Sequence, residues 1–109
     1  MIKGIGVDIV QISRIQCTEA FVKKILSDDE YRLFTKIPNE HRKKEFLAGR
    51  FACKEAYSKA LGTGIGKVGF RDISVINDEF GKPVINQENT LVSIAHEKEY
   101  AIAYVLIQE

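Results

Sequence analysis

The hydrophobic pattern changes twice along the chain and divides it into a first strand, a helical stretch and a set of short strands. Residues 2–8 are rich in Ile and Val, as strands are. Apolar residues then recur at helical spacing to about residue 61, after which the pattern again favours strands. We expect helices at about 13–26, 27–36 and 40–61, and strands at 2–8, 70–77, 83–86, 91–95 and 100–107.

Local end signals support these helices. Ser13 with Gln16, and Ser27 with Glu30, match the capping box, in which the two side chains bond each other's backbone N–H groups. Asn39 is a good N-cap for the long helix. The start of each helix can therefore be predicted from residues close to it in the sequence.

The last predicted strand, residues 100–107, is apolar throughout. A strand with one face in water should alternate apolar and polar residues, so this run implies that both faces are buried. Two explanations fit equally well: the strand is fully internal within the chain, or a second copy of the chain covers one face. The elements together predict an α+β fold, with a long helix packed on a small, mainly antiparallel sheet.

Composition limits the classes of protein that fit. The 109 residues suggest a single domain over 1–109, and 45% hydrophobic with 28% charged residues is typical of a globular chain. The formal net charge of +1 gives no overall attraction to nucleic acid. No stretch has the length of a membrane span or signal peptide, and Cys17 and Cys53 lack metal or redox spacing. We expect a cytoplasmic protein that neither binds nucleic acid nor inserts into a membrane.

Charged side chains lie on and beside the apolar face of the long helix. Glu55 and Lys59 are one turn apart at its edge, and Arg50 and Lys54 fall within it. A further acid, Asp8, ends the first predicted strand. Two carboxylates and a lysine are the groups needed to hold a divalent cation against phosphate. The alternative is a solvated Glu55–Lys59 pair, with Arg50 and Lys54 extending their charges to water.

Three blocks of sequence occur in a characteristic order. The first is Gly-Ile-Gly-Val-Asp-Ile-Val at residues 4–10, followed by Arg14. The second, Arg-Phe-Ala-Cys-Lys-Glu-Ala-Tyr-Ser-Lys, begins at residue 50 within a longer block over 45–64. The third is Ser-Ile-Ala-His at 93–96, with Tyr-Ala four residues further on. Together the blocks resemble the holo-acyl-carrier-protein synthase family of phosphopantetheinyl transferases over nearly the whole chain.

The resemblance implies an activity and a metal. Family members transfer 4′-phosphopantetheine from coenzyme A to a serine of apo-acyl carrier protein, giving holo-acyl carrier protein and adenosine 3′,5′-bisphosphate, and so support fatty acid biosynthesis. By this resemblance Asp8 and Glu55 bind Mg²⁺, with Mn²⁺ as the candidate substitute, and Lys59 contacts the phosphates. These three are the expected catalytic residues. The group that takes the serine proton stays open among Glu55, a metal-bound water, and Asp8 through a water.

The resemblance also implies contacts with coenzyme A and the carrier protein. The residues expected to bind coenzyme A are Arg50, Lys54, Lys59, Gly62, Gly64 and His96. Without the resemblance, the two glycines are interpreted as a helix C-cap and connector, and His96 as a structural residue. Arg14 is expected to bind the acidic carrier protein. Lys23, Lys24 and residues 42–44 are further candidates, although a short basic run is usually a solvated surface. Family members form homotrimers with active sites between subunits, which is the assembly we expect here.

Two other functions fit parts of the same pattern. A non-catalytic module that docks an acidic protein would need Arg14 but neither Asp8 nor Glu55. A small metal-dependent phosphohydrolase would release product from coenzyme A without any carrier protein. The transferase accounts for more of the sequence than either of these.

Overall fold

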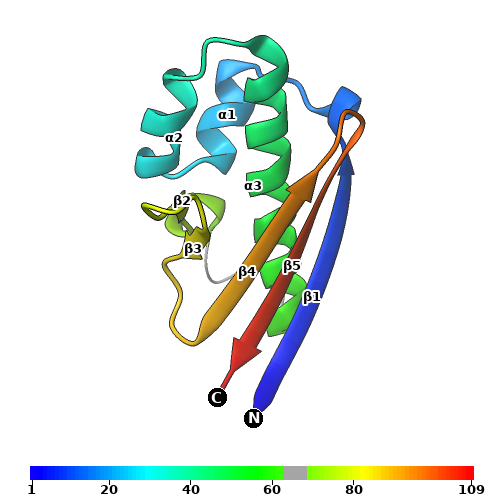
Figure 1. Cartoon of the computed structure of the whole chain (residues 1–109), viewed down its shortest axis with the longest axis vertical. Coiled ribbons are helices and arrows are strands. Elements are labelled where there is room, and N and C mark those ends of the chain that lie inside the picture. Colours follow the sequence, from blue (N-terminus) through cyan, green and yellow to red (C-terminus); the bar gives the residue numbers. More distant parts are fainter. Residues whose placement is uncertain (63–68) are drawn as a thin grey trace.

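Three strands form an antiparallel sheet in the order β1-β5-β4 in this computed structural model, which describes residues 1–62 and 69–109 (Figure 1). The strands are β1 (Ile2–Gln11), β4 (Thr90–His96) and β5 (Tyr100–Gln108). The register places Asp8 of β1 opposite Ala103 of β5. The predicted α+β class is confirmed. The first and last strands extend beyond their predicted ends, to Gln11 and Gln108.

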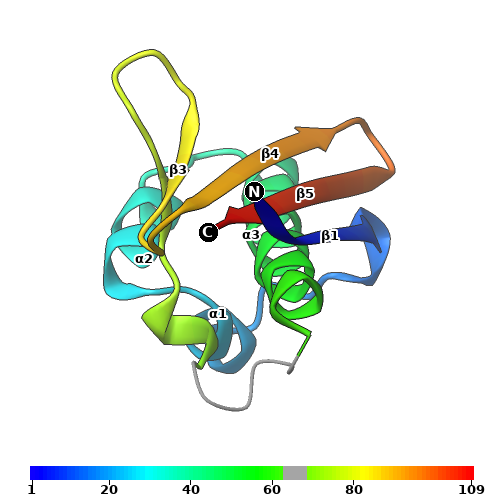
Figure 2. The same ribbon diagram turned by 90° about the horizontal axis from the view of Figure 1, so that it is seen from below.

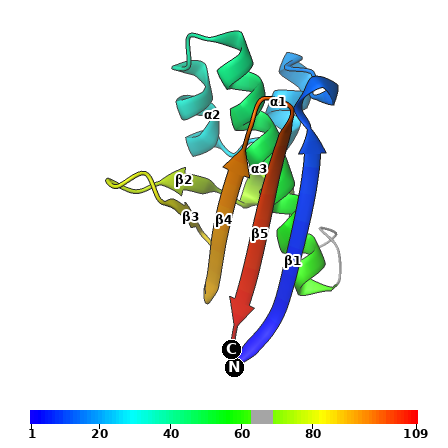
Figure 3. The same ribbon diagram turned by 45° about the vertical axis from the view of Figure 1, so that its right-hand side comes forward.

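The long helix α3 (Glu40–Leu61) covers one face of this sheet, and the other face is open (Figure 3). The side chain of Asn39 accepts a hydrogen bond from the Arg42 N–H at 3.0 Å and so caps the start of the helix. Gly62 ends the helix at a φ of +78°, a left-handed conformation that glycine adopts without strain. Both predicted helix ends are therefore confirmed.

Two shorter helices pack beside α3, away from the sheet (Figure 2). They are α1 (Glu19–Ile25) and α2 (Asp28–Thr35). The capping box of Ser27 and Glu30 at the start of α2 is confirmed. The predicted box at Ser13 and Gln16 is wrong, because Thr18 caps α1 by accepting from the Phe21 N–H at 3.3 Å.

The reason for this difference lies far along the chain. The Ile12 N–H donates to the carbonyl of Glu99 at 2.8 Å, so backbone pairing with the β4–β5 turn extends to the residue just before Ser13. Residues Ile12–Arg14 form only a short 3-10 turn, η1, and Ile15 returns to an extended conformation. Pairing with the β4–β5 turn therefore overrides the local signal at Ser13.

A small hairpin lies beside the main sheet. It is formed by β2 (Val75–Asn77) and β3 (Pro83–Ile85), which pair with each other as a separate two-stranded sheet. The prediction of a strand from residue 70 is wrong for its first part, because Phe70–Asp72 forms a 3-10 turn, η2. The Asp72 carboxylate accepts from the Gly69 N–H at 3.1 Å and stabilises that turn.

The central strand β5 is buried on one face and open on the other. Ala101, Ala103 and Val105 face α3 and are at most 1% exposed, whereas Ile102 and Tyr104 on the opposite face are 41% and 46% exposed. The explanation that this strand is fully internal within the chain is therefore wrong. Coverage by a second copy stays a prediction. Over the described residues, α3 and the shorter helices all lack the length and apolar character needed to cross a membrane.

Candidate active site

Asp8 and Glu55 line the same open pocket, whose volume is about 490 Å³. Arg14 of η1 lies on its wall, and the apolar part of the wall includes Phe21 of α1 and Phe51 of α3. The pocket therefore joins two carboxylates, one guanidinium and an aromatic surface. Two carboxylates that the sequence separates by 47 positions are brought to one site by the packing of β1 on α3.

Close packing of β1 on α3 explains why these residues meet. A side chain at Gly6 would place its Cβ 2.0 Å from the Ala56 carbonyl oxygen, and one at Gly4 would lie 2.1 Å from that of Ala60. Two residues of an extended strand span about 6 Å, and four residues of an α-helix span about the same length. The contacts between β1 and α3 therefore repeat every two residues of the strand and every four residues of the helix. Asp8 is the next residue on this face of β1, which places it beside the preceding turns of α3.

Lys59 contacts Asp8 directly. Its Nζ donates to Asp8 Oδ1 at 3.1 Å and to the carbonyl of Val7 at 3.1 Å. The Asp8 side chain is 18% exposed and that of Lys59 is 56% exposed. Within the described part of the chain, the ion pair of Lys59 is thus with Asp8 and not with Glu55. The alternative of an isolated, solvated Glu55–Lys59 pair is therefore wrong.

Lys54 is fully buried, which overturns its expected contact with coenzyme A. Its Nζ donates to the carbonyls of Ile25 and Phe70 and to Glu30, at 2.6, 2.9 and 2.5 Å respectively. An ammonium has three N–H donors, and all three are used inside the protein. Desolvation lowers the Lys54 pKa, and the Glu30 carboxylate opposes that shift.

Arg50 is also largely buried, with 8% of its surface exposed. Its Nε donates to the Val75 carbonyl at 3.2 Å, its Nη2 donates to Asn77 Oδ1 at 2.8 Å, and its guanidinium lies over the Phe46 ring at 4.1 Å. These contacts tie α3 to the β2–β3 hairpin. A contact between Arg50 and coenzyme A stays a prediction.

His96 lies outside the pocket of Asp8 and Glu55, at the other edge of the sheet. Its Nδ1 is 3.2 Å from Glu45 Oε2, and its Nε2 is 3.4 Å from Arg42 Nη1. Arg42 also donates to Glu45 Oε1 at 2.9 Å, and this hydrogen bond lowers the Glu45 pKa. Within one chain, His96 therefore belongs to a separate cluster on the first turns of α3.

Sequence reasoning missed the central member of that cluster, Glu45. Arg42 is three residues before it on α3 and His41 is four residues before it, with the His41 Nε2 3.7 Å from Glu45 Oε2. This helical spacing was a usable signal. The contact of His96 with Glu45 could not be predicted from the sequence, because it depends on the packing of β4 against α3.

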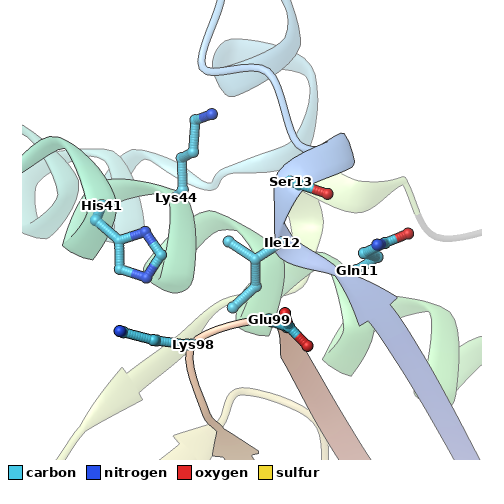
Figure 4. A pocket seen from close by; sticks show the side chains of 7 residues that line it. All are labelled: Gln11, Ile12, Ser13, His41, Lys44, Lys98 and Glu99. Carbon is cyan, nitrogen blue, oxygen red and sulfur yellow. The ribbon is translucent and has the colours of Figure 1, made fainter.

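A second pocket, of about 300 Å³, opens where η1 meets the start of α3 and the β4–β5 turn (Figure 4). Its lining side chains are Gln11, Ile12, Ser13, His41, Lys44, Lys98 and Glu99. Lys44 belongs to the basic run predicted as a candidate docking surface. Among the residues that the structure describes, those predicted for catalysis and for coenzyme A binding do not line this pocket.

The remaining predicted residues fall into three groups. Arg14 lines the Asp8 pocket, as a residue that binds an incoming partner would need to do. Gly62 is the C-cap of α3, whereas Gly64 lies outside the described residues. The Lys23 ammonium is 2.9 Å from the Glu19 carboxylate one helical turn earlier, and both side chains are exposed.

Comparison with known proteins gives the family. The family model of the 4′-phosphopantetheinyl transferase superfamily matches residues 4–105. Holo-[acyl-carrier-protein] synthase of Geobacillus sp. (strain WCH70) is 50% identical over 117 residues, covering 99% of this chain and 98% of that protein. A Bacillus anthracis str. Ames holo-(acyl-carrier-protein) synthase crystallised with CoA (3′,5′-ADP) has a TM-score of 0.91 at 47% identity, covering 97% of this chain and 96% of that one.

A more distant structure shows the same fold. The Helicobacter pylori holo-[acyl-carrier-protein] synthase in complex with coenzyme A is 35% identical, with a TM-score of 0.78, and the match covers 94% of this chain and 97% of that one. The chain therefore belongs to the 4′-phosphopantetheinyl transferase superfamily, among its holo-[acyl-carrier-protein] synthases.

Proposed function

We propose that the pocket between β1 and α3 is where this chain transfers 4′-phosphopantetheine from coenzyme A to a serine of apo-acyl carrier protein, leaving adenosine 3′,5′-bisphosphate. The transferase activity follows from the family. The observation that supports this pocket is that Asp8 and Glu55 line it together. The nearby Lys59 adds a cation that can pair with the phosphate oxygens of a substrate.

The donor set fits Mg²⁺, or Mn²⁺ in its place. One or two protein carboxylates are the usual protein ligands of Mg²⁺ in phosphoryl-transfer sites. Among the described residues, no group of three or more His, Cys, Asp and Glu side chains is arranged to hold a metal. Asp8 and Glu55 would hold the ion, and the ion would neutralise charge on the phosphate oxygens.

Lys59 has two roles in this proposal. Its contact with Asp8 Oδ1 and the Val7 carbonyl orients the carboxylate, and its exposed ammonium, which lines a neighbouring pocket, can donate to a phosphate held beside Asp8. Because Lys59 holds Oδ1, Oδ2 is the Asp8 oxygen that is free of this contact. Glu55 and Asp8 both lie at the pocket, so both stay candidates for receiving the serine proton.

Contacts with the two substrates extend beyond this pocket. Arg14 on the wall fits an acidic carrier protein, because a guanidinium pairs with carboxylates in a bidentate manner. We assign coenzyme A contacts to Lys59, His96, Arg50, Gly62 and Gly64, the last of which lies outside the described residues. Lys54 is left out of this set because its ammonium is buried.

A homotrimer is supported by the open face of the sheet. Its exposed apolar residues come from all three strands: Ile5, Val7, Ile9, Leu91, Tyr100, Ile102 and Tyr104. An exposed apolar surface of this extent marks an interface. We propose that other copies of the same chain cover this face.

The trimer is tested with one substitution on this face and one outside it. Tyr104→Glu should give monomers in light scattering, and Ile76→Glu, on the separate hairpin, should stay trimeric. A trimeric Tyr104→Glu would contradict this.

The transfer reaction is tested by mass spectrometry. Apo-acyl carrier protein with coenzyme A, Mg²⁺ and this chain should gain the mass of one phosphopantetheine. Asp8→Asn and Glu55→Gln should each remove this gain, and should weaken Mn²⁺ binding measured by electron paramagnetic resonance. Glu79→Gln, an exposed acid on the hairpin, is the matched control. Release of phosphopantetheine without carrier protein would instead indicate a phosphohydrolase, and carrier binding without transfer would indicate a docking module.

A further inference from the structure

Lys54 is a charged residue at the centre of the protein that the proposed reaction does not use. Its three hydrogen bonds reach the last residue of α1 through the Ile25 carbonyl, α2 through Glu30, and η2 through the Phe70 carbonyl. The side chain is 0% exposed. One ammonium therefore fixes three segments against α3.

Glu30 completes this arrangement. Its Oε1 accepts from the Ser27 N–H at 2.9 Å as well as from Lys54, and its Oε2 accepts from the Val75 N–H at 2.8 Å. The pair therefore also holds the start of β2. Replacing a buried ion pair with apolar side chains is often neutral or stabilising. Stability alone is thus a weak reason for this chain to carry one here.

An aromatic row connects the pair to the active-site pocket. The Phe70 ring stacks on Phe51 at 5.9 Å between centroids, and Phe51 meets Phe21 at 5.9 Å. Phe51 and Phe21 form part of the wall of the pocket that holds Asp8 and Glu55. Lys54 holds the backbone of Phe70 and the end of the helix that carries Phe21. Moving either backbone would move the wall.

We propose that Lys54, together with Glu30, is a positioning residue for the transfer reaction. It fixes the backbone at Ile25 and Phe70, and thereby holds Phe21 and Phe51 as a rigid wall beside the two carboxylates. This inference rests on the proposed use of the pocket between β1 and α3. Lys54 acts through the aromatic row and touches neither substrate.

The test uses Lys54→Met/Glu30→Gln, which removes both charges and keeps an acceptor oxygen for one of the two N–H groups, of Ser27 and Val75, that bond the Glu30 carboxylate. The second variant is Phe70→Leu, which removes the ring that contacts Phe51. Transfer to apo-acyl carrier protein is measured as kcat and KM for each substrate, per folded molecule. Tyr57→Phe is the matched control, because Tyr57 is a buried residue of α3 that bonds Gln87 outside the row.

We expect kcat/KM to fall about 10- to 100-fold in the double variant, because small displacements near a reacting centre have effects of this size. Mn²⁺ affinity should stay within about twofold, since Asp8 and Glu55 are kept. Adding Phe70→Leu to the double variant should cause little further loss, because both changes act through the same wall. Tyr57→Phe should keep the wild-type kcat/KM.

Two results would overturn the inference: a folded double variant with wild-type kcat/KM, or losses from the two changes that simply add. If the double variant does not fold, Phe70→Leu alone decides, because wild-type kcat and KM in that variant would show that the row does not position the pocket. Failure of the proposed function is seen separately, as an absence of transfer or of Mn²⁺ binding in the unaltered chain.

Discussion

Lys59 Nζ lies 3.1 Å from Asp8 Oδ1, although the two residues are 51 positions apart. The contact joins the long helix to an edge strand. It pairs an ammonium that can bind phosphate with a carboxylate that can bind a metal ion. Its value for stability is small, because both side chains reach water. The contact therefore matters mainly for the geometry of the site.

The first prediction follows from this contact. Lys59→Met should cost at most about 1 kcal/mol in the free energy of unfolding, measured with urea. It should lower kcat for transfer to the carrier protein by about 100- to 1000-fold, the usual effect of removing a group that stabilises charge in a transition state. Lys36→Met, which changes an exposed lysine at the end of α2, should leave both quantities unchanged. Full activity in Lys59→Met would remove Lys59 from the reaction.

The second prediction concerns the glycines of β1 that pack against α3. Gly6→Ala would bring a Cβ to 2.0 Å from the Ala56 carbonyl oxygen, so the strand and helix must separate. We expect a loss of about 1–3 kcal/mol in stability, with weaker Mn²⁺ binding because Asp8 and Glu55 move apart. Gly49→Ala is the control, since its Cβ would meet only the Ile94 Cγ2, at 3.2 Å. Equal stability of the two variants would contradict this account of the packing.

The parts of the fold that were predicted correctly have signals that lie close together in the sequence. Asn39 and Gly62 mark the ends of α3 by rules that concern only neighbouring residues. Asp8 and Glu55 were paired through the family blocks, and the structure brings them to one pocket. The glycine pattern before Asp8 is the physical basis of that pairing, because it allows β1 to approach the helix.

The parts that were missed depend on partners far along the chain. The resemblance implies that Lys54 contacts coenzyme A, but its three acceptors lie within the chain, 29, 24 and 16 positions away. Ser13 failed as a cap because Ile12 pairs with Glu99. Helical spacing places a side chain on a face of its own helix. It does not show which other segment covers that face.

The third prediction concerns acid stability. The hydrogen bond from Arg42 lowers the Glu45 pKa in the folded chain below its ordinary value of 4.5, so the unfolded chain binds more protons near that pH. The stabilisation from Glu45 should be complete above about pH 4.5 and should disappear as the pH falls through the lowered folded pKa. Glu45→Gln should therefore show a shallower loss of urea stability on acidification than the unaltered chain, with a difference of up to about 1 kcal/mol. Glu79→Gln should follow the unaltered chain, and a parallel curve for Glu45→Gln would contradict the prediction.

The fourth prediction concerns the two thiols. Burial raises the Cys53 pKa to about 12, and its side chain is fully enclosed, so the reactive thiolate is almost absent at neutral pH. Cys17 is only partly buried. A disulfide reagent such as dithiobisnitrobenzoate should therefore modify one thiol of the native protein and the second only after unfolding. In Cys17→Ser the native protein should not react, and release of thiol should follow the unfolding curve in urea. Rapid reaction of native Cys17→Ser would show that α3 opens locally around Cys53, and would contradict the close packing of this helix on the sheet.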